Sequence, residues 1–138
     1  MNHRRAMAVA AAVLLSLSAP ALAAPHNVRF YSILEESAQL AVDGGPARDI
    51  PSGSVNFYSL SPGQHSFALT TASGGTISLN ANLDDGQMSA SRGRSWWCVM
   101  TGRRSSDQQL VLMLDTPQQC ASMLAVAPEN DDPSDGTK

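Results

Sequence analysis

Short apolar or alternating runs recur along the chain from Val28 onward, about every eight to twelve residues, with turn-forming residues between them. This spacing is typical of the strands of a β-sandwich or barrel. From Val28 on, only residues 117–127 suggest a helix, because Cys120, Met123 and Leu124 share one side of that short segment. The pattern therefore predicts an all-β fold, a small antiparallel β-sandwich of seven or eight strands over residues 27–126, with a short C-terminal helix.

The expected strands differ in how their apolar residues are arranged. Residues 76–83 (TISLNANL) alternate apolar and polar, so one face should be buried and the other wet. Residues 110–114 (LVLML) are apolar throughout, as in a central strand covered on both faces. Pro-Gly inside the sequence SPGQ at 61–64 favours a type II turn and predicts a hairpin between residues 54–60 and 65–71. Further strands are expected at 28–34, 38–42 and 95–101.

The first 23 residues have the layout of a secretory signal peptide. Arg4 and Arg5 precede an apolar run over residues 6–17, and the sequence ALA at 21–23 is a small-x-small cleavage motif. The apolar run is shorter than the roughly 20 residues that cross a bilayer. No cysteine lies at the cleavage site, so the usual bacterial lipid attachment is not expected. We therefore expect an exported protein, periplasmic or secreted, without a membrane span after cleavage.

Length and charge indicate one domain followed by an acidic tail. Cleavage after Ala23 leaves 115 of the 138 residues, the size of a single domain. Two of the nine basic residues lie in the signal, so seven remain against twelve acidic ones. Four of those acids fall within residues 128–138, whose low hydrophobicity predicts disorder. The domain itself is close to neutral, which argues against nucleic acid as a partner. The four acids are Glu129, Asp131, Asp132 and Asp135.

The two cysteines of the chain, Cys98 and Cys120, are expected to form a disulfide, because an exported protein meets an oxidising environment. A reactive thiol is the alternative, but no CxxC redox motif surrounds Cys98. A metal site with the cysteines would have only His26 and His65 to complete it. We expect neither a metal nor a cofactor.

Catalysis is not expected from this sequence. The chain has no GxSxG motif, and His65 is the only histidine inside the strand-rich region besides His26 at its start. His65 follows a turn, so we expect it to be exposed to solvent, and its replacement by alanine should change stability by no more than about 0.5 kcal/mol. A catalytic triad built on His65 is the alternative that the sequence leaves open.

A segment rich in arginine and tryptophan is the candidate ligand-binding site. Adjacent residues of a strand point to opposite faces, so one indole should enter the core. The other indole should lie under a loop or stack on a ligand such as a sugar, with arginines nearby to hold carboxylates or phosphates. The alternative is that both rings are structural and the arginines are merely solvated. The candidate residues are Arg92, Arg94, Trp96, Trp97, Arg103 and Arg104.

About half of the chain resembles a known family. It begins with VRFYS at 28–32, continues through LAVDGG at 40–45 and FYSLSPGQHSFAL at 57–69, and ends with TISLNANLDDGQ at 76–87. This order of features resembles the sandwich domains of the alginate O-acetylation accessory protein AlgF and a broader family of secreted domains. The resemblance implies a periplasmic protein without catalytic residues of its own, acting with acetyl-transfer partners on an exopolysaccharide. The chain is long enough for one sandwich, where that family has two.

The sequence therefore favours an exported, non-enzymatic adaptor or binding module in exopolysaccharide O-acetylation or export. Its expected partners are proteins of the cell envelope, such as an acetyl-transfer complex, and a polysaccharide. The alternative is a secreted envelope protein that binds another protein through an exposed sheet edge. A small hydrolase is a third, less favoured interpretation of the sequence.

Overall fold

A computed structural model describes residues 25–126 of the chain. The signal peptide expected at 1–23 and the acidic tail expected at 128–138 lie outside the described residues. Within them the elements are β1 (Val28–Ser32), β2 (Ala38–Val42), β3 (Arg48–Ile50), β4 (Val55–Tyr58), β5 (Gly63–Thr71), β6 (Thr76–Leu83), the 3-10 turn η1 (Asp85–Gln87), β7 (Ser89–Ser91), β8 (Arg94–Arg103), β9 (Leu110–Leu114) and α2 (Pro117–Val126).

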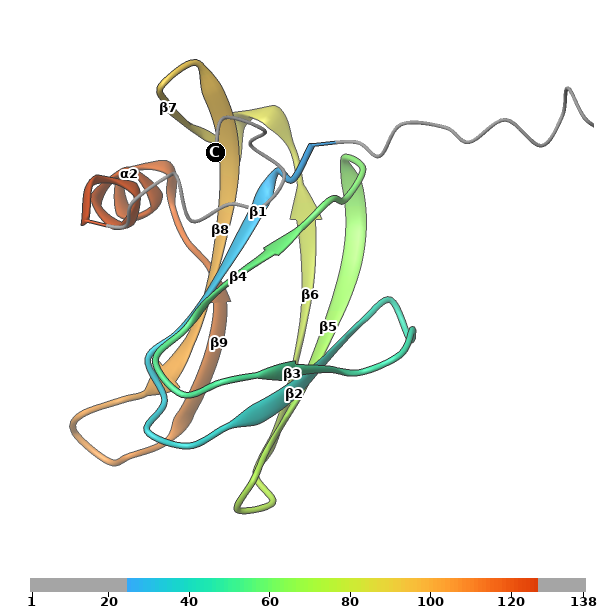
Figure 1. Ribbon diagram of the computed structural model, residues 1–138, viewed down its shortest axis with the longest axis vertical. Coiled ribbons are helices and arrows are strands. Elements are labelled where there is room, and N and C mark those ends of the chain that lie inside the picture. The colour runs from blue at the N-terminus through green and yellow to red at the C-terminus, as the bar shows by residue number, and fades with distance from the viewer. Residues whose placement is uncertain (1–24, 127–138) are drawn as a thin grey trace, which may run out of the picture.

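The strands form two sheets, which confirms the all-β prediction (Figure 1). The five-stranded sheet has the order β4-β1-β8, and both β7 and β9 pair with β8 along the edge that β1 leaves free. The four-stranded sheet has the order β3-β2-β5-β6. One cluster of buried residues draws side chains from both sheets, including Phe30 and Val99 from one and Leu40 and Phe67 from the other. The two sheets therefore enclose a single core between them.

One pair of strands departs from the expected antiparallel arrangement. β1 runs parallel to β8, with Val28 opposite Trp97 and Ser32 opposite Thr101, while the other pairs are antiparallel. The described residues also hold nine strands, more than the seven or eight expected. Parallel neighbours need a long crossover connection. Here the chain between β1 and β8 supplies it by building the whole four-stranded sheet.

The prediction of a hairpin around residues 61–64 is wrong. β4 pairs with β1, whereas β5 pairs with β2 and β6, so this turn carries the chain from one sheet to the other. Pro-Gly chemistry reverses the chain direction but does not decide which strands pair. The turn at Asp43 and Gly44 instead connects β2 and β3 into a hairpin. Both residues have positive φ, 55° for Asp43 and 72° for Gly44. Positive φ at both central positions is the signature of a type I′ hairpin turn.

The expected burial patterns hold for β6 but not for β9. In β6, Ala81 and Leu83 are buried and Ile77 packs against the core, while the intervening side chains are exposed, as the alternation predicts. β9 is not a central strand, because it pairs only with β8. Two neighbouring strands are covered on both faces: all five residues of β1 and residues 96–99 of β8 are buried. The apolar run of β9 is partly buried along its length although this strand pairs with a single neighbour.

The outer face of the five-stranded sheet carries a second buried cluster under α2. We call it the outer cluster: Tyr31, Phe57, Trp96, Cys98, Cys120 and Leu124. Cys98 of β8 and Cys120 of α2 form the expected disulfide, with Cα atoms 5.3 Å apart. The helix expected near the C-terminus is thus present and is covalently held against the sheet (Figure 1). No helix among residues 25–126 has the length and apolar content that crossing a bilayer requires.

Candidate functional site

Both tryptophans of the predicted site are buried. Trp97 points into the core between the sheets, and its Nε1 donates a hydrogen bond to the carbonyl of Asp84 at 2.8 Å. Trp96 points to the opposite face and belongs to the outer cluster, with no exposed surface. The second indole was expected either to lie under a covering segment or to stack on a ligand, and in the structure it is covered. Neither ring presents a face on which a sugar can stack directly.

The four predicted arginines lie at two separate places. Arg94, at the start of β8, places its guanidinium 4.4 Å from the Trp96 ring and donates a hydrogen bond to the carbonyl of His26 at 2.6 Å. Arg92 lies in the turn just before β8. Arg103 and Arg104 lie at the other end of this ten-residue strand, about 30 Å away at the usual rise per residue.

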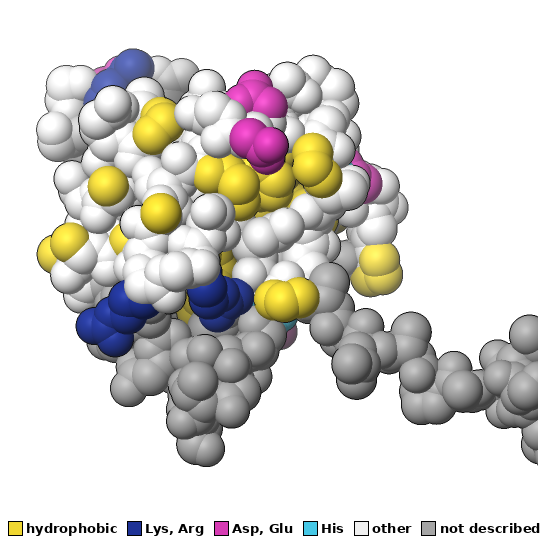
Figure 2. Space-filling model, turned by 90° about the horizontal axis from the view of Figure 1, so that it is seen from above, with side chains coloured by type: hydrophobic (Ala, Val, Ile, Leu, Met, Phe, Trp, Pro, Cys, Tyr) yellow, Lys and Arg dark blue, Asp and Glu magenta, His cyan; other side chains and the backbone are white. Residues whose placement is uncertain are grey.

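Arg103 pairs with Glu36 at 3.1 Å and Arg104 with Asp107 at 2.7 Å. Figure 2 accordingly shows the dark blue basic side chains in separate groups and not as one basic patch. The structure thus brings together Arg94 and Trp96 but leaves Arg103 and Arg104 elsewhere.

A fifth arginine, Arg29, occupies the centre of the outer cluster. It lies on β1, opposite Phe57 of β4 on one side and Cys98 of β8 on the other. Its guanidinium carbon lies 4.5 Å from the Trp96 ring centroid and 5.5 Å from that of Phe57, and the side chain has no exposed surface. Arg29 is not among the residues predicted for the site, because it stands within the strand-forming run VRFYS at 28–32. A lone charge among VRFYS was the available signal.

The Arg29 guanidinium lacks the hydrogen bonds that a buried charge normally makes. Within residues 25–126, none of its three nitrogens has a hydrogen-bond partner, and the same holds for the Tyr31 hydroxyl and Trp96 Nε1 nearby. An uncompensated buried charge costs several kcal/mol. Cation–π contacts with desolvated rings return about 2 kcal/mol, so stacking offsets only part of this cost. Most buried polar groups in folded proteins are paired, and this cluster of unpaired donors therefore marks a site.

Asp115 adds a buried acid to the same face of the sheet. It directly follows β9, its backbone NH donates to the carbonyl of Cys98 at 2.8 Å, and it is 4% exposed. Burial raises its pKa to about 6. Burial also raises the pKa of Tyr31 above its usual 10, although the adjacent Arg29 side chain partly opposes this effect. The outer face thus combines a buried cation with a carboxyl that resists ionisation.

His65 is not the exposed residue that the sequence predicted. Its side chain is 10% exposed, and its Nδ1 lies 2.6 Å from Asp43 Oδ2 while Nε2 lies 2.7 Å from the carbonyl oxygen of Ser61. Both partners are acceptors, so both ring nitrogens must carry hydrogen. Burial of the ring lowers the pKa of His65, but the bonds to Asp43 and Ser61 outweigh burial and raise it above 6.5. A charged ring with both nitrogens engaged is not available as a general base.

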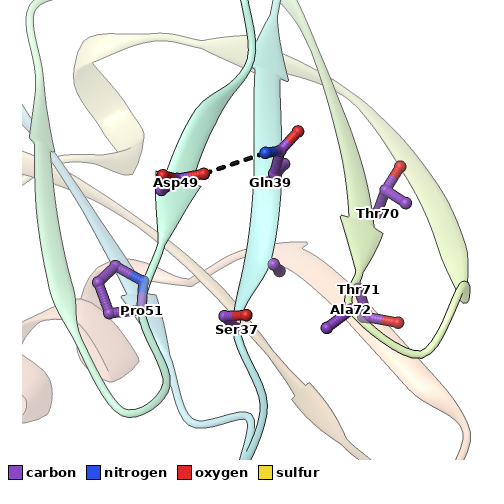
Figure 3. A pocket seen from close by; sticks show the side chains of 8 residues that line it. Ser37, Gln39, Asp49, Pro51, Thr70, Thr71 and Ala72 are labelled. Atoms are coloured by element: carbon purple, nitrogen blue, oxygen red, sulfur yellow. Dashed lines mark hydrogen bonds between the residues drawn. The ribbon is translucent and has the colours of Figure 1, made fainter.

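The outer face of the four-stranded sheet is polar and open. Four polar residues lie side by side, one on each of its strands: Asp49, Gln39, Thr70 and Thr76. We call these residues the polar row. All four are exposed, and Gln39 Nε2 donates to Asp49 Oδ1 at 3.0 Å (Figure 3). Beside the row lies a hollow of about 470 Å³, within the usual size of ligand pockets. Its lining residues are Ser37, Ala38, Gln39, Asp49, Pro51, Thr70, Thr71 and Ala72.

The fold and these two faces define a class of protein: a disulfide-linked β-sandwich with one polar open face and one face covered by a helix. A scan against models of known protein families finds none that matches this chain. A search of curated proteins likewise finds no match. The resemblance to AlgF domains therefore rests on the sequence features alone.

Proposed function

We propose that this protein is an exported, non-catalytic binding module that contacts a polysaccharide, as an adaptor in the acetylation or export of that polymer. The observation that carries the proposal is the polar row beside the hollow on the four-stranded sheet. Hydroxyl and amide side chains on a flat sheet can exchange hydrogen bonds with sugar hydroxyls along an extended chain. A ligand can reach this face without moving any part of the fold.

The composition of the hollow supports a hydroxyl-rich ligand of low charge. The polar row contains one carboxylate, Asp49, and no cation. Pro51 and Ala72 add apolar side chains to two sides of the lining (Figure 3), against which the methyl group of an acetyl ester can pack. Ligand sites commonly combine such apolar lining with a few placed polar groups. We therefore expect neutral or acetylated polymers to bind better than fully ionised uronate polymers.

Two further features support an exported, non-catalytic role. The Cys98–Cys120 disulfide fits an oxidising compartment, and we propose the periplasm or the cell exterior. His65 is engaged by two acceptors and makes no bond to a serine hydroxyl, so its geometry favours a structural role over a catalytic one. The resemblance to AlgF domains points in the same direction.

Titration calorimetry with acetylated and deacetylated forms of a neutral polysaccharide tests the proposal. The double variant Gln39→Ala with Thr70→Ala should weaken binding by about tenfold, the effect of losing roughly 1.4 kcal/mol of hydrogen bonding. The matched control, Gln64→Ala with Asn82→Ala, changes exposed polar residues that face each other on β5 and β6 at the far end of the same sheet, and should leave affinity unchanged. Equal affinity of all three proteins, or no binding, would exclude the polar row as the contact.

A second candidate function is binding of a protein partner by strand addition at β6. This eight-residue strand ends the four-stranded sheet and pairs only with β5, whereas the opposite edge strand, β3, has three residues. Part of β6 lies close to β9 of the other sheet, and the rest of its unpaired edge can accept an added strand. A photo-crosslinking residue at Asn80 should trap a protein partner in the cell envelope, and one at Ser105, in the β8–β9 turn, should not. Crosslinks at both positions or at neither would argue against this function.

A further inference from the structure

The outer cluster brings together buried polar atoms that make no hydrogen bond within the described part of the chain. The unpartnered atoms are the three guanidinium nitrogens of Arg29, the Tyr31 hydroxyl oxygen and Trp96 Nε1. Arg29 and Tyr31 lie on the same face of β1, and Trp96 lies beside Arg29 on β8. Guanidinium and indole nitrogens can only donate hydrogen bonds. A buried group of donors around one positive charge is complementary to an anion.

The acidic side chains of residues 25–126 do not supply that anion. Asp115 faces the same side of the sheet as Arg29, but neither an ion pair nor a hydrogen bond joins the two side chains. The ion pairs described for other acids are made with other cations: Glu36 with Arg103, Asp43 with His65 and Asp107 with Arg104. The counterion of Arg29 must therefore come from outside this part of the chain.

We propose that Arg29 is the anchor of a carboxylate-binding site on the outer face of the five-stranded sheet, with Tyr31 and Trp96 as additional donors. This site is distinct from the polar row and does not depend on the polysaccharide proposal. A planar guanidinium donates two parallel hydrogen bonds to a carboxylate. A singly charged carboxylate balances the one uncompensated charge, which lies against the rings of Phe57 and Trp96.

The carboxylate has two sources, and the structure favours one of them. Arg29 is completely buried, which favours a group from the same molecule over a ligand that diffuses in. Helix α2 lies on this face, Leu124 belongs to the outer cluster, and the described chain ends at Val126. Glu129 follows three residues later, within about 10 Å of chain, and three aspartates come after it. The second source is a free carboxylate, such as that of a uronic acid.

NMR of the Arg29 Nε–H group in the full-length mature protein tests the proposal on the native side chain. The signal is assigned in the wild type through scalar couplings from the Arg29 backbone resonances, and the Nε–H of Arg104 serves as an exposed control. One arm compares the wild type with a variant carrying Glu129→Gln, Asp131→Asn, Asp132→Asn and Asp135→Asn. The other arm adds sodium glucuronate to both proteins, with glucose as the uncharged control. Neither arm requires Arg29 to be replaced, so a failure of Arg29 variants to fold does not affect the result.

The two arms separate the sources of the carboxylate. If the chain supplies it, neutralising the four acids shifts the Arg29 signal and speeds its exchange with solvent at least tenfold, while Arg104 is unaffected. If a free ligand supplies it, the four substitutions have no effect, and glucuronate but not glucose shifts the Arg29 signal to saturation. Either result supports the site. An Arg29 signal that responds to neither the substitutions nor glucuronate would overturn it.

Discussion

At the scale of single residues, His65 shows how two acceptors determine the charge of a ring. Asp43 occupies one ring nitrogen and the Ser61 carbonyl the other, so the neutral ring would lose one of the two bonds. Asp43 also accepts a hydrogen bond from the backbone NH of Ser66 at 2.9 Å. The contact therefore ties the β2–β3 turn to β5. This role was not visible in the sequence, where Asp43 was only a turn residue.

We predict that His65→Ala lowers the free energy of unfolding by about 1 to 2 kcal/mol at pH 6, because two hydrogen bonds of a charged ring are lost. This exceeds the 0.5 kcal/mol expected from the sequence. The folded pKa of His65 is raised above 6.5, so its contribution is complete below pH about 6.5 and is lost as pH rises through the folded pKa.

Urea unfolding of the wild type and His65→Ala between pH 5 and 9 measures this difference. The gap between the two proteins should narrow toward alkaline pH. Ser59→Ala, an exposed change near the same turn, serves as the control and should show no such trend. A gap that is constant across this range would rule out a charged His65 as its cause.

Asp115 is predicted to behave in the opposite way, as a residue whose charge opposes folding. Its folded pKa is raised to about 6 by burial, so the folded state favours the protonated form and stability falls as pH rises from about 4 through 6. Asp115→Asn should therefore raise the unfolding free energy at pH 7 by about 1 to 3 kcal/mol, at 1.36 kcal/mol per pKa unit.

Thermal unfolding at pH 4 and pH 7 measures the effect of Asp115→Asn. The stabilisation should be present at pH 7 and almost absent at pH 4. Asp85→Asn removes an exposed carboxylate and should change neither value. Destabilisation of Asp115→Asn at pH 7 would instead mean that the native carboxylate has a favourable partner.

At the scale of elements, α2 begins with a reciprocal cap. Thr116 Oγ1 accepts a hydrogen bond from the backbone NH of Gln119 at 3.2 Å, and Gln119 Oε1 accepts one from the NH of Thr116 at 2.9 Å. This is a capping box, and Pro117 occupies the first helical position, where proline is favoured. The cap positions Cys120 one turn into the helix, next to Cys98.

We predict that Thr116→Ala destabilises the protein by about 1 kcal/mol, the usual cost of losing an N-cap. Circular dichroism during urea unfolding measures it. Ser122→Ala, in the same helix, removes an exposed hydroxyl bonded to the carbonyl of Gln118 and should cost less than half as much. Equal losses for the two variants would show that the cap contributes nothing specific.

Sequence patterns located most elements but could not assign their partners. The alternation of β6 indicated both the strand and its buried face, because the two-residue period depends only on local geometry. Which strands pair depends on contacts between distant segments, so the role of residues 61–64 and the edge position of β9 were misread. β3 was missed because its three residues contain a single apolar side chain, Ile50.

The candidate site was predicted only in part, because sequence patterns show which residues are neighbours along one strand but not which strands pair. Trp96 and Arg94 lie together because two positions along one strand share a face. Arg103 lies far from both residues because β8 is extended, so a short separation in sequence corresponds to a long distance in space. Arg29 comes from β1, and its place beside Trp96 follows from the β1–β8 pairing. The capping box at Thr116, by contrast, is a local pattern: TPQQ at 116–119 places a glutamine three residues after the threonine.

At the scale of the whole molecule, the disulfide holds the helix-covered face together. It links residues 22 positions apart, and closing a loop of this size stabilises by about 3 kcal/mol in the chain-entropy description. We predict that Cys98→Ala combined with Cys120→Ala lowers the unfolding free energy by about this amount. Reduction of the wild type should have a similar effect.

Non-reducing mass spectrometry of exported protein should show the intact bridge, and urea unfolding of the oxidised, reduced and doubly substituted proteins gives the energies. The oxidised form should be clearly the most stable of the three. Two free thiols in exported material, or identical stability of the oxidised and reduced forms, would contradict the prediction.

The parallel β1–β8 pair has a consequence for the order of folding. β1 lies at the start of the domain, and its neighbour in the five-stranded sheet begins at Arg94. Pairing between such distant segments slows folding. A long loop must close, at a cost in chain entropy, before the stabilising contacts between the two strands can form. A chain that emerges N-terminus first therefore keeps one side of β1 unpaired until nearly the whole domain has appeared. Fragments truncated before residue 94 should be aggregation-prone, and holdase chaperones should recognise the nascent chain at β1.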